Sequence, residues 1–222
     1  MAKVAFVLTV YNKEAWIAQT IRSIQQQTLE DIEIIVWNDG STDHSMDIVS
    51  RLAKDDKRIV SSGTNYNQGI SKAYNQAHKL ITAPYVCIAS ADDIYDKRRA
   101  QLTYDILSKG KDIMYGWFWR VNPDLSPIEH KMPGVFNKEK LNLPNNQYIP
   151  HGFLSITKKL LLEVPYEESI KYGIDYPWLK QLAEKVPPKQ WKRIKADLGM
   201  YRWLPKNVSH EHRKEIWEQD NK

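Results

Sequence analysis

Two adjacent carboxylates, Asp92 and Asp93, end the uncharged and largely apolar stretch 85–91. A short apolar run between helix-like segments is typical of a strand buried on both faces of a parallel sheet. In open α/β sheets, ligands bind at the carboxyl edge of the strands. Carboxylate oxygens at that edge suit a hard cation such as Mg²⁺ or Mn²⁺. The pair therefore marks a candidate metal site, although a turn or a helix N-cap would use the same residues.

Two more side chains with useful chemistry follow strand-like runs near the amino terminus. Tyr11 comes after the apolar run 4–10 and offers a flat ring on which a base could stack, or it is a surface tyrosine. Asp39 comes after the run 32–37 and can accept a hydrogen bond from a pyrimidine ring N–H. Gly40 lets the backbone turn closely there, so Asp39 also fits an ordinary turn.

Strand-like and helix-like segments alternate through the first half of the chain. Apolar runs predict strands at 4–10, 32–37, 58–62 and 85–90, and the helical spacing of apolar residues predicts helices that end near residues 24, 54, 81 and 108. This order predicts an α/β fold with a mostly parallel central sheet covered by helices on both faces. Neither a Gly-x-Gly-x-x-Gly nor a P-loop sequence is present, so the specific signs of dinucleotide-binding and P-loop proteins are missing.

The second half of the chain is less regular. We expect a strand at 112–120, with Trp117 and Trp119 on one side, because side chains alternate along a strand. Residues 122–150 contain five prolines and little periodicity, which predicts a long irregular segment facing an acceptor. We also expect a strand that returns to the sheet at 151–157, helices at 158–163 and 173–186, a last strand at 198–203 and a helical tail at 209–219.

Composition narrows the class of protein. The chain has 222 residues, of which 42% are hydrophobic, and this is enough for one large domain with a real core. Its net charge is +5. Residues 185–222 hold ten Lys or Arg against five Asp or Glu, so this end could meet phosphate, membrane headgroups or nucleic acid, or simply be solvated. Cys87 is the only cysteine, which suits a reducing compartment. With no signal-peptide pattern and no apolar run of about 18 residues, we expect a cytoplasmic protein whose membrane contact, if any, is peripheral.

Five stretches resemble the family 2 glycosyltransferases of the GT-A fold, in the order that the family has them. They are Thr-Val-Tyr-Asn at 9–12, Trp-Asn-Asp-Gly-Ser-Thr-Asp at 37–43, Asn-Gln-Gly-Ile-Ser-Lys-Ala-Tyr-Asn at 67–75, Ala-Ser-Ala-Asp-Asp at 89–93 and Gly-Ile-Asp-Tyr-Pro-Trp at 173–178. The resemblance spans roughly residues 3–203. It implies a GT-A domain at 1–204, with a nucleotide-sugar-binding half at 1–108, an acceptor-binding and catalytic half at 109–204, and a basic tail at 205–222.

The resemblance also implies what the site residues do. The family transfers a sugar from a nucleoside diphosphate and inverts its anomeric centre, with Mn²⁺ or Mg²⁺ stabilising the leaving diphosphate. Consecutive residues in an extended segment point apart, so Asp92 and Asp93 should not both bind one ion. The resemblance implies that Asp93 binds the metal and that Asp92 faces the ribose. The expected nucleotide-sugar contacts are Thr9, Tyr11, Asp39, Ser41, Gly69, Lys72 and Asp92.

The late acidic motif of the family supplies the base that takes the proton of the acceptor hydroxyl. Here this motif is reduced to Asp175, which is therefore the expected catalytic base, with a helix N-cap as the alternative. His151, Gly152 and Trp178 are expected on the acceptor side, although His151 equally fits a polar loop. The chain departs from the common family pattern at Ser90, Tyr74, Ile174 and Leu204, where the family often has Asp, Arg, a second acid and His.

The sequence favours a UDP-sugar donor, because Tyr11 and Asp39 fit a pyrimidine. The default acceptor for the family is a surface glycan or glycolipid precursor. Two alternatives remain: transfer to hydroxymethylated bases of DNA, suggested by the basic carboxyl end and its tryptophans, and a non-catalytic nucleotide-sugar-binding module, suggested by the four departures. A metal-dependent phosphohydrolase is a weaker third, because no early Asp-x-Asp nucleophile motif is present.

Overall fold

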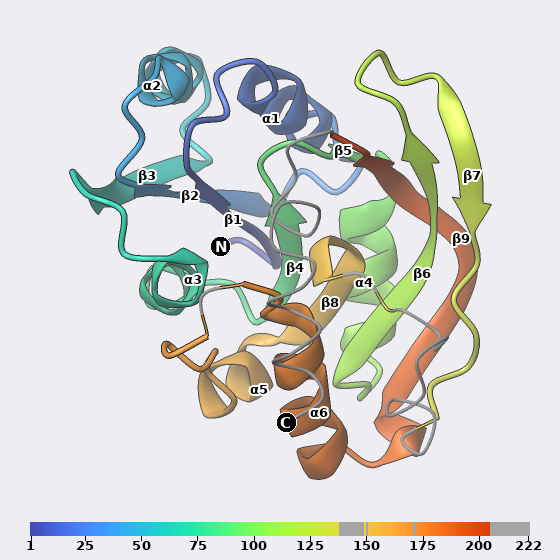
Figure 1. Ribbon diagram of the computed structural model, residues 1–222. Helices are drawn as coiled ribbons and strands as arrows, with labels where there is room; N and C mark the ends of the chain where they lie inside the picture. Colours follow the sequence, from blue (N-terminus) through green and yellow to red (C-terminus); the bar gives the residue numbers. More distant parts are fainter. Residues whose placement is uncertain (138–148, 150, 171, 205–222) are drawn as a thin grey trace.

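The computed structural model describes residues 1–137, 149, 151–170 and 172–204, and in this part of the chain one nine-stranded sheet runs through the molecule (Figure 1). The strand order is β3-β2-β1-β4-β8-β6-β9-β5, and β7 pairs with the second half of β6. No helix in these residues is long and apolar enough to cross a bilayer.

The first four strands form the parallel part of the sheet, as the apolar runs predict. They are β1 (Val4–Val10), β2 (Ile32–Asp39), β3 (Ile59–Thr64) and β4 (Tyr85–Ser90). β1 lies between β2 and β4 and is parallel to both. All of its side chains except that of Thr9 are buried, which is why the sequence reads as a continuous apolar run.

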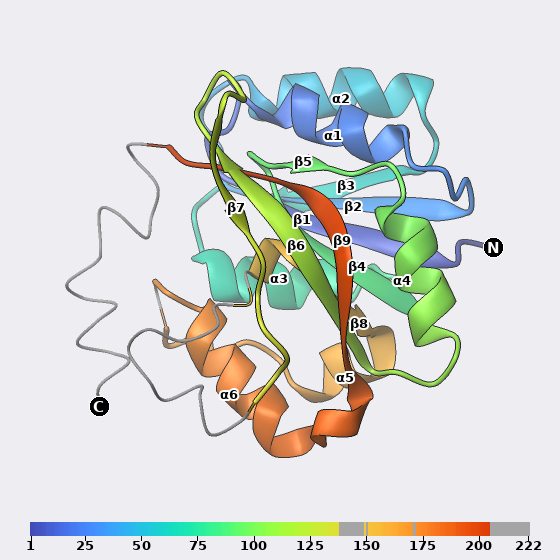
Figure 2. The same ribbon diagram turned by 90° about the vertical axis from the view of Figure 1, so that its right-hand side faces the viewer.

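Helices cover both faces of the sheet and divide the core into two layers (Figure 2). One face packs against α1 (Ile17–Gln25), α2 (Ser45–Asp55) and α4 (Arg99–Leu107). The other packs against α3 (Ile70–His78), α5 (Lys158–Glu163) and α6 (Asp175–Lys185). The predicted α/β class with helices on both faces is confirmed.

The second half of the sheet is mixed. β8 (Leu154–Thr157) is antiparallel to β4 and to β6 (Ile113–Val121), and β6 is parallel to β9 (Trp191–Arg202). The two-residue strand β5 (Ile94–Tyr95) pairs with β9. The sheet is thus parallel in its first half and gains antiparallel pairs where the chain returns through β8.

Two expectations for the second half of the chain need correction, and a third concerns residues outside the described ranges. Residues Pro127–Lys131 form strand β7 on the edge of β6, so the segment 122–150 is not wholly irregular. The last strand begins at Trp191 rather than near residue 198, because its charged first half pairs with β6. The expected tail helix at 209–219 lies outside the described residues.

A histidine is buried in the layer formed by α3 and α6. His78 is 2% exposed, and its ring lies 6.0 Å from that of Tyr74 and 5.6 Å from that of Tyr166. Its Nε2 atom has no hydrogen-bond partner in the described part of the chain. Burial lowers the pKa of His78 to about 3, with the nearby His151 acting in the same direction. The neutral ring is therefore the form that the fold accepts.

We expect this histidine to make the protein less stable in acid. A histidine in the unfolded chain takes up a proton below about pH 6.5, whereas the folded His78 stays neutral to about pH 3, so stability falls as the pH drops between these values. Between pH 7 and pH 5 the loss from this group is at most about 2 kcal/mol. Urea unfolding at pH 7 and pH 5 should show that His78→Phe loses less free energy of unfolding on acidification than wild type does. The exposed variant His44→Gln should show no such reduction. An unchanged loss in His78→Phe would contradict the assignment.

Candidate active site

Several predicted site residues meet because three parallel strands end at one edge of the sheet. β1 is paired with β2 through Val10 and Asn38, and with β4 through Thr9 and Ser90. The loops that follow these three strands therefore lie side by side. They carry Tyr11, the residues 39–41, and the acidic pair at 92–93.

The loop after β1 is fastened to the loop after β2. Asn12 adopts a left-handed backbone conformation with φ of 52°, which asparagine tolerates better than most residues. Its Oδ1 accepts a hydrogen bond from the Thr42 amide at 2.8 Å, and its own amide donates to the Ser41 hydroxyl at 3.2 Å. One residue later, the Lys13 amide donates to Ser45 Oγ at 2.8 Å. These contacts fix the backbone on which Tyr11 and Lys13 stand.

Asp39 is buried and holds the loop before α3. Its Oδ1 accepts from the amide of Gln68 at 2.8 Å, and the Gly69 amide also contributes. Burial raises the pKa of Asp39, and the two backbone hydrogen bonds oppose that rise. At least one carboxylate oxygen is thus occupied by the protein itself, so a base contact would use the other oxygen.

Gly40 is required where the loops after β2 and β3 touch. Its φ is +76°, and a Cβ atom here would lie 2.3 Å from the Tyr66 carbonyl carbon. We expect Gly40→Ala to lower the free energy of unfolding by roughly 2–4 kcal/mol, because the backbone itself must move. Gly110→Ala is a matched control, since Gly110 also has a positive φ of +87° but nothing lies within 4 Å of its added Cβ.

Gly110→Ala should lower the free energy of unfolding by only about 1–2 kcal/mol, which is the cost of placing a residue other than glycine in the left-handed conformation. Urea unfolding measures both variants, and UDP binding by calorimetry should weaken in Gly40→Ala alone. Equal stability losses in the two variants would mean that the contact with Tyr66 relaxes freely.

The remaining nucleotide-side residues are placed as follows. Tyr11 is 47% exposed, so its ring is available to a ligand. The Ser41 hydroxyl donates to the Val10 carbonyl, and Thr9 bonds the Tyr74 hydroxyl, so both have partners within the protein. Gly69 forms the N-cap of α3 with φ of 92°, and Lys72 lies half-buried in the first turn of that helix.

Tyr74 stands where the family often has arginine, and it cannot replace that charge. Its side chain is 2% exposed, and its hydroxyl donates to the Ala89 carbonyl at 2.7 Å. The ring therefore belongs to the core beneath the acidic motif rather than to a phosphate site.

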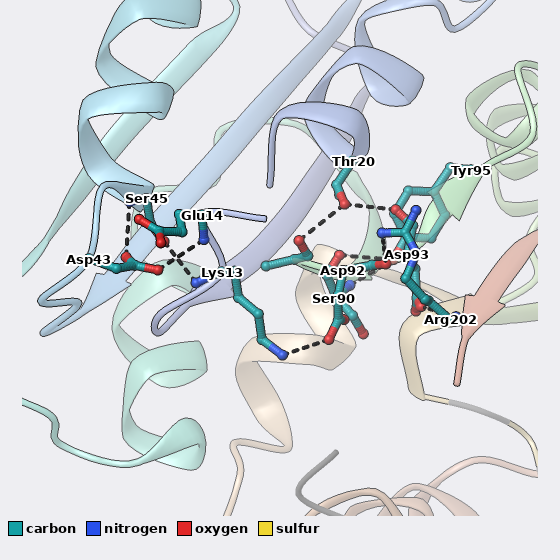
Figure 3. Close-up of polar contacts among 11 residues, drawn as sticks. Lys13, Glu14, Thr20, Asp43, Ser45, Ser90, Asp92, Asp93, Tyr95 and Arg202 are labelled. Atoms are coloured by element: carbon teal, nitrogen blue, oxygen red, sulfur yellow. Dashed lines mark hydrogen bonds and ion pairs between the residues drawn. The ribbon is translucent and has the colours of Figure 1, made fainter. Parts of the chain in front are cut away.

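Asp92 directs its carboxylate toward a lysine from the loop after β1 (Figure 3). Lys13 Nζ lies 2.6 Å from Asp92 Oδ2, and the two side chains are 28% and 14% exposed. The pair joins positions 79 residues apart in the chain. Asp92 is therefore the partly accessible acid of the motif, and it already faces a positive charge.

Asp93 is instead enclosed by the protein. It is 1% exposed, and its Oδ1 accepts from the Arg202 amide at 2.9 Å. Burial raises the pKa of Asp93 well above its usual range, and the charge of Asp92 adds to this. A Cβ atom added to Gly152 would lie 3.3 Å from Asp93 Oδ2, so that oxygen faces the backbone of the turn 151–153.

Arg202, at the end of β9, ties the acidic motif to α1. Its Nη1 donates to the Asp92 carbonyl at 2.9 Å, and its Nη2 donates to Gln19 Oε1 at 2.7 Å. The guanidinium also lies 4.5 Å from the centre of the Trp16 ring. The motif is thus held from the backbone side, which leaves the Asp92 side chain to meet a ligand.

The acidic motif fits a divalent cation that shares its ligands with a phosphate. No group of three or more His, Cys, Asp or Glu in the described ranges could hold a metal; His210 and His212 lie outside these ranges. A cation here would take one or two carboxylate oxygens and complete its shell with phosphate and water, as Mg²⁺ often does. Asp92 is the partly accessible acid and already faces an ammonium, which fits a site for positive charge.

Asp175 reaches the same region from the other half of the chain. It is the first residue of α6, and Ile174 takes the N-cap position without a side-chain hydrogen bond, so the N-cap alternative for Asp175 is not what the structure shows. Burial raises the pKa of Tyr74, and the charges of Asp175, Asp92 and Asp93 raise it further. The charges of all three carboxylates therefore act on the Tyr74 hydroxyl.

The expected acceptor-side residues lie deeper than predicted. His151 is 6% exposed, its Nε2 contacts the Tyr166 hydroxyl, and burial lowers its pKa. Trp178 is 2% exposed and donates from Nε1 to the Val164 carbonyl at 2.8 Å. Both rings belong to the core, so direct acceptor contact by His151 or Trp178 is at odds with the structure. Gly152 lines the buried side of Asp93, and its carbonyl accepts from Arg99.

Three residues of this region were missed from the sequence. Lys13 and Arg99 carry no motif that would single them out among 32 basic residues. Arg99 is fully buried and donates to the carbonyls of Ile88, Gly152 and Leu154, so it clamps β4 to the turn before β8. Arg202 was given no role, although the Tyr-Arg pair at 201–202 resembles a motif near the end of the family's catalytic domain.

The sequence has clear relatives. The model of glycosyl transferase family 2 matches residues 5–164. An uncharacterized glycosyltransferase of Bacillus subtilis is 34% identical over 218 residues, which cover 93% of this chain and 62% of that protein. The chondroitin synthase of Pasteurella multocida is 28% identical over 186 residues, and an uncharacterized glycosyltransferase of Rickettsia bellii is 32% identical over 137 residues. These matches span only 19% and 20% of those two proteins.

Solved structures share the fold at lower identity. The S. aureus TarS fragment 1–349 in complex with UDP superposes with a TM-score of 0.75 at 17% identity, over 98% of this chain and 64% of that chain. The mannosyltransferase PcManGT from Pyrobaculum calidifontis, in complex with GDP-Man and Mn²⁺, gives 0.70 at 14% identity, over 98% and 62%. The fold is thus the GT-A fold, and the family match covers most of the chain. This chain belongs to glycosyl transferase family 2.

Proposed function

We propose that this enzyme transfers a sugar from a nucleoside diphosphate to a hydroxyl group, with inversion at the anomeric carbon and with the help of Mn²⁺ or Mg²⁺. The observation that supports the proposal is the acidic pair Asp92 and Asp93 after β4, at the carboxyl edge of the parallel strands, where Asp92 faces the Lys13 ammonium. In this proposal a diphosphate and a cation bind beside Asp92 and Asp93. A third carboxylate, Asp175, comes from α6 and is available as a base.

The donor binds, in this proposal, across the loops after β1 and β2. Tyr11 stacks on the base, and Asp39 accepts from its ring N–H with the oxygen that is not bonded to Gln68. UDP is the favoured nucleotide for this reason, and TarS has been crystallised with UDP and with UDP-GlcNAc. The GDP-Man complex of the mannosyltransferase shows that the same fold also accepts a purine.

The metal ligand is proposed to be Asp92 rather than the predicted Asp93. A cation that also contacts a diphosphate must be reachable from the side where the donor binds. Asp92 is partly accessible, whereas Asp93 Oδ2 is buried against the turn at Gly152. A bound Mn²⁺ or Mg²⁺ would supply Lewis-acid stabilisation of the leaving diphosphate. Asp93 then anchors the motif to Arg202.

Asp175 is proposed as the catalytic base. The acceptor oxygen attacks the anomeric carbon from the face opposite the diphosphate. As the new C–O bond forms, the bond from the anomeric carbon to the diphosphate oxygen breaks, and the diphosphate leaves with the electron pair. Asp175 takes the hydroxyl proton, which makes the acceptor oxygen a stronger nucleophile. The proposal is supported by its position in the first turn of α6 and by its charge, which acts on the Tyr74 hydroxyl together with those of Asp92 and Asp93.

A glycan or glycolipid precursor is the proposed acceptor. Relatives include a chondroitin synthase and a hyaluronan synthase of Pasteurella and a teichoic acid poly(glycerol phosphate) polymerase of Staphylococcus epidermidis. The alternative of DNA as acceptor rests on the ten basic residues at 185–222, of which six lie within the described residues and four lie beyond residue 204.

The test is release of nucleoside diphosphate from a panel of sugar nucleotides with Mn²⁺, with and without oligosaccharide or glycolipid acceptors. We expect one donor to be turned over, and turnover to rise with the right acceptor and to stop with chelator. Turnover that is unaffected by chelator would overturn the metal assignment, and binding of every donor without turnover would overturn the proposed transfer.

A further inference from the structure

We propose that Lys13 is a positioning residue that holds Asp92 until the donor arrives, so that a divalent cation binds well only together with the nucleotide diphosphate. This inference rests on the donor site proposed above. It concerns one contact: the 2.6 Å pair between Lys13 Nζ and Asp92 Oδ2 (Figure 3).

The backbone of Lys13 is fixed on both sides. Its amide donates to Ser45 Oγ at 2.8 Å, and its carbonyl accepts from the amides of Trp16 and Ile17, each at 2.9 Å. The root of the side chain therefore stays in place, while its four-carbon stem lets the ammonium move by several ångströms. A lysine anchored in this way can change partners without any change of the loop.

Charge explains why the partner would change. Without donor, Asp92 is the accessible carboxylate of the motif, and the ammonium is its counter-charge. A divalent cation at Asp92 must displace this ammonium and then lie beside it, and two positive charges a few ångströms apart repel. A diphosphate brings negative oxygens that accept from the ammonium, so donor and cation together remove the conflict.

Lys13 is also better placed for this role than the lysine that the sequence suggested. Lys72 lies half-buried in the first turn of α3, on the face of the sheet opposite α1. Lys13 comes from the loop between β1 and α1 and already contacts the motif. The geometry therefore assigns the charge next to the diphosphate to Lys13.

The experiment measures Mn²⁺ binding by electron paramagnetic resonance of the free ion, and UDP binding by calorimetry, for wild type, Lys13→Met and Lys3→Met. Lys3 pairs with Asp31 at 2.8 Å on the surface, so its variant removes a similar ion pair far from the motif. We expect Lys13→Met to bind Mn²⁺ about fivefold more tightly without nucleotide. We expect it to bind UDP about fivefold more weakly when Mn²⁺ is saturating. Lys3→Met should change neither value, and melting curves should show that both variants fold.

Equal Mn²⁺ affinity of Lys13→Met and wild type in the absence of nucleotide would overturn the inference. So would unchanged UDP affinity at saturating Mn²⁺. Failure of the proposed function is seen separately: it would show as no UDP binding by the wild-type protein under any metal condition. The Mn²⁺ measurement without nucleotide still judges Lys13 in that case.

Discussion

Asp175→Asn is expected to lower kcat by about 10²–10⁴-fold while leaving donor affinity nearly unchanged, because the amide has the shape of the carboxylate but cannot take the proton of the acceptor hydroxyl. Steady-state release of nucleoside diphosphate gives kcat, and calorimetry with UDP gives the affinity. The split between the two values is the diagnostic result, since a residue needed only for packing would disturb both.

Glu184→Gln is a matched control for Asp175→Asn. Glu184 lies on the same helix, α6, but is exposed, so the same chemical change there should leave kcat and UDP affinity as in wild type. If Asp175→Asn keeps more than a fifth of the wild-type kcat, Asp175 is not the base. A group other than Asp175 would then have to take the proton of the acceptor hydroxyl.

The sequence predicts best the elements that are buried on both faces. β1 and β4 have the predicted bounds, Val4–Val10 and Tyr85–Ser90, because a strand inside a parallel sheet must be apolar along its whole length. Strand β7 and the first half of β9 were missed. Their residues are mostly polar or charged and only partly buried, so their pairing with β6 leaves little trace in the apolar pattern.

The same reasoning explains which site residues could be predicted. The family motifs single out Asp39, Asp92 and Asp175 as candidates, because these residues end, follow and begin elements that are visible in the sequence. Lys13 could not be found in this way, since its contact with Asp92 depends on the parallel register of β1 and β4. Trp178 was expected on the acceptor side, but it is 2% exposed and packs in the core.

Asp92 is partly exposed and Asp93 is buried, so we expect the amide variants of these two neighbouring acids to behave differently. Asp92→Asn should lower Mn²⁺-dependent UDP affinity and kcat/KM by at least about 100-fold, because it removes the accessible carboxylate charge that a cation and Lys13 would share. Asp93→Asn should keep most of its UDP affinity. Its carboxyl is buried with a raised pKa, so the neutral amide resembles the form that the fold favours.

The reverse pattern would restore the division of roles that the sequence predicts, with Asp93 on the metal. Calorimetry with UDP at several Mn²⁺ concentrations distinguishes the two, provided that melting temperatures show both variants to be folded. Asp93→Leu adds a second measurement, since it keeps the volume but removes the acceptor for the Arg202 amide. A buried donor left without a partner costs about 1–3 kcal/mol. We therefore expect this variant to lose stability, whereas Asp92→Asn loses donor binding, because one acid of the pair holds the motif in place and the other meets the ligand.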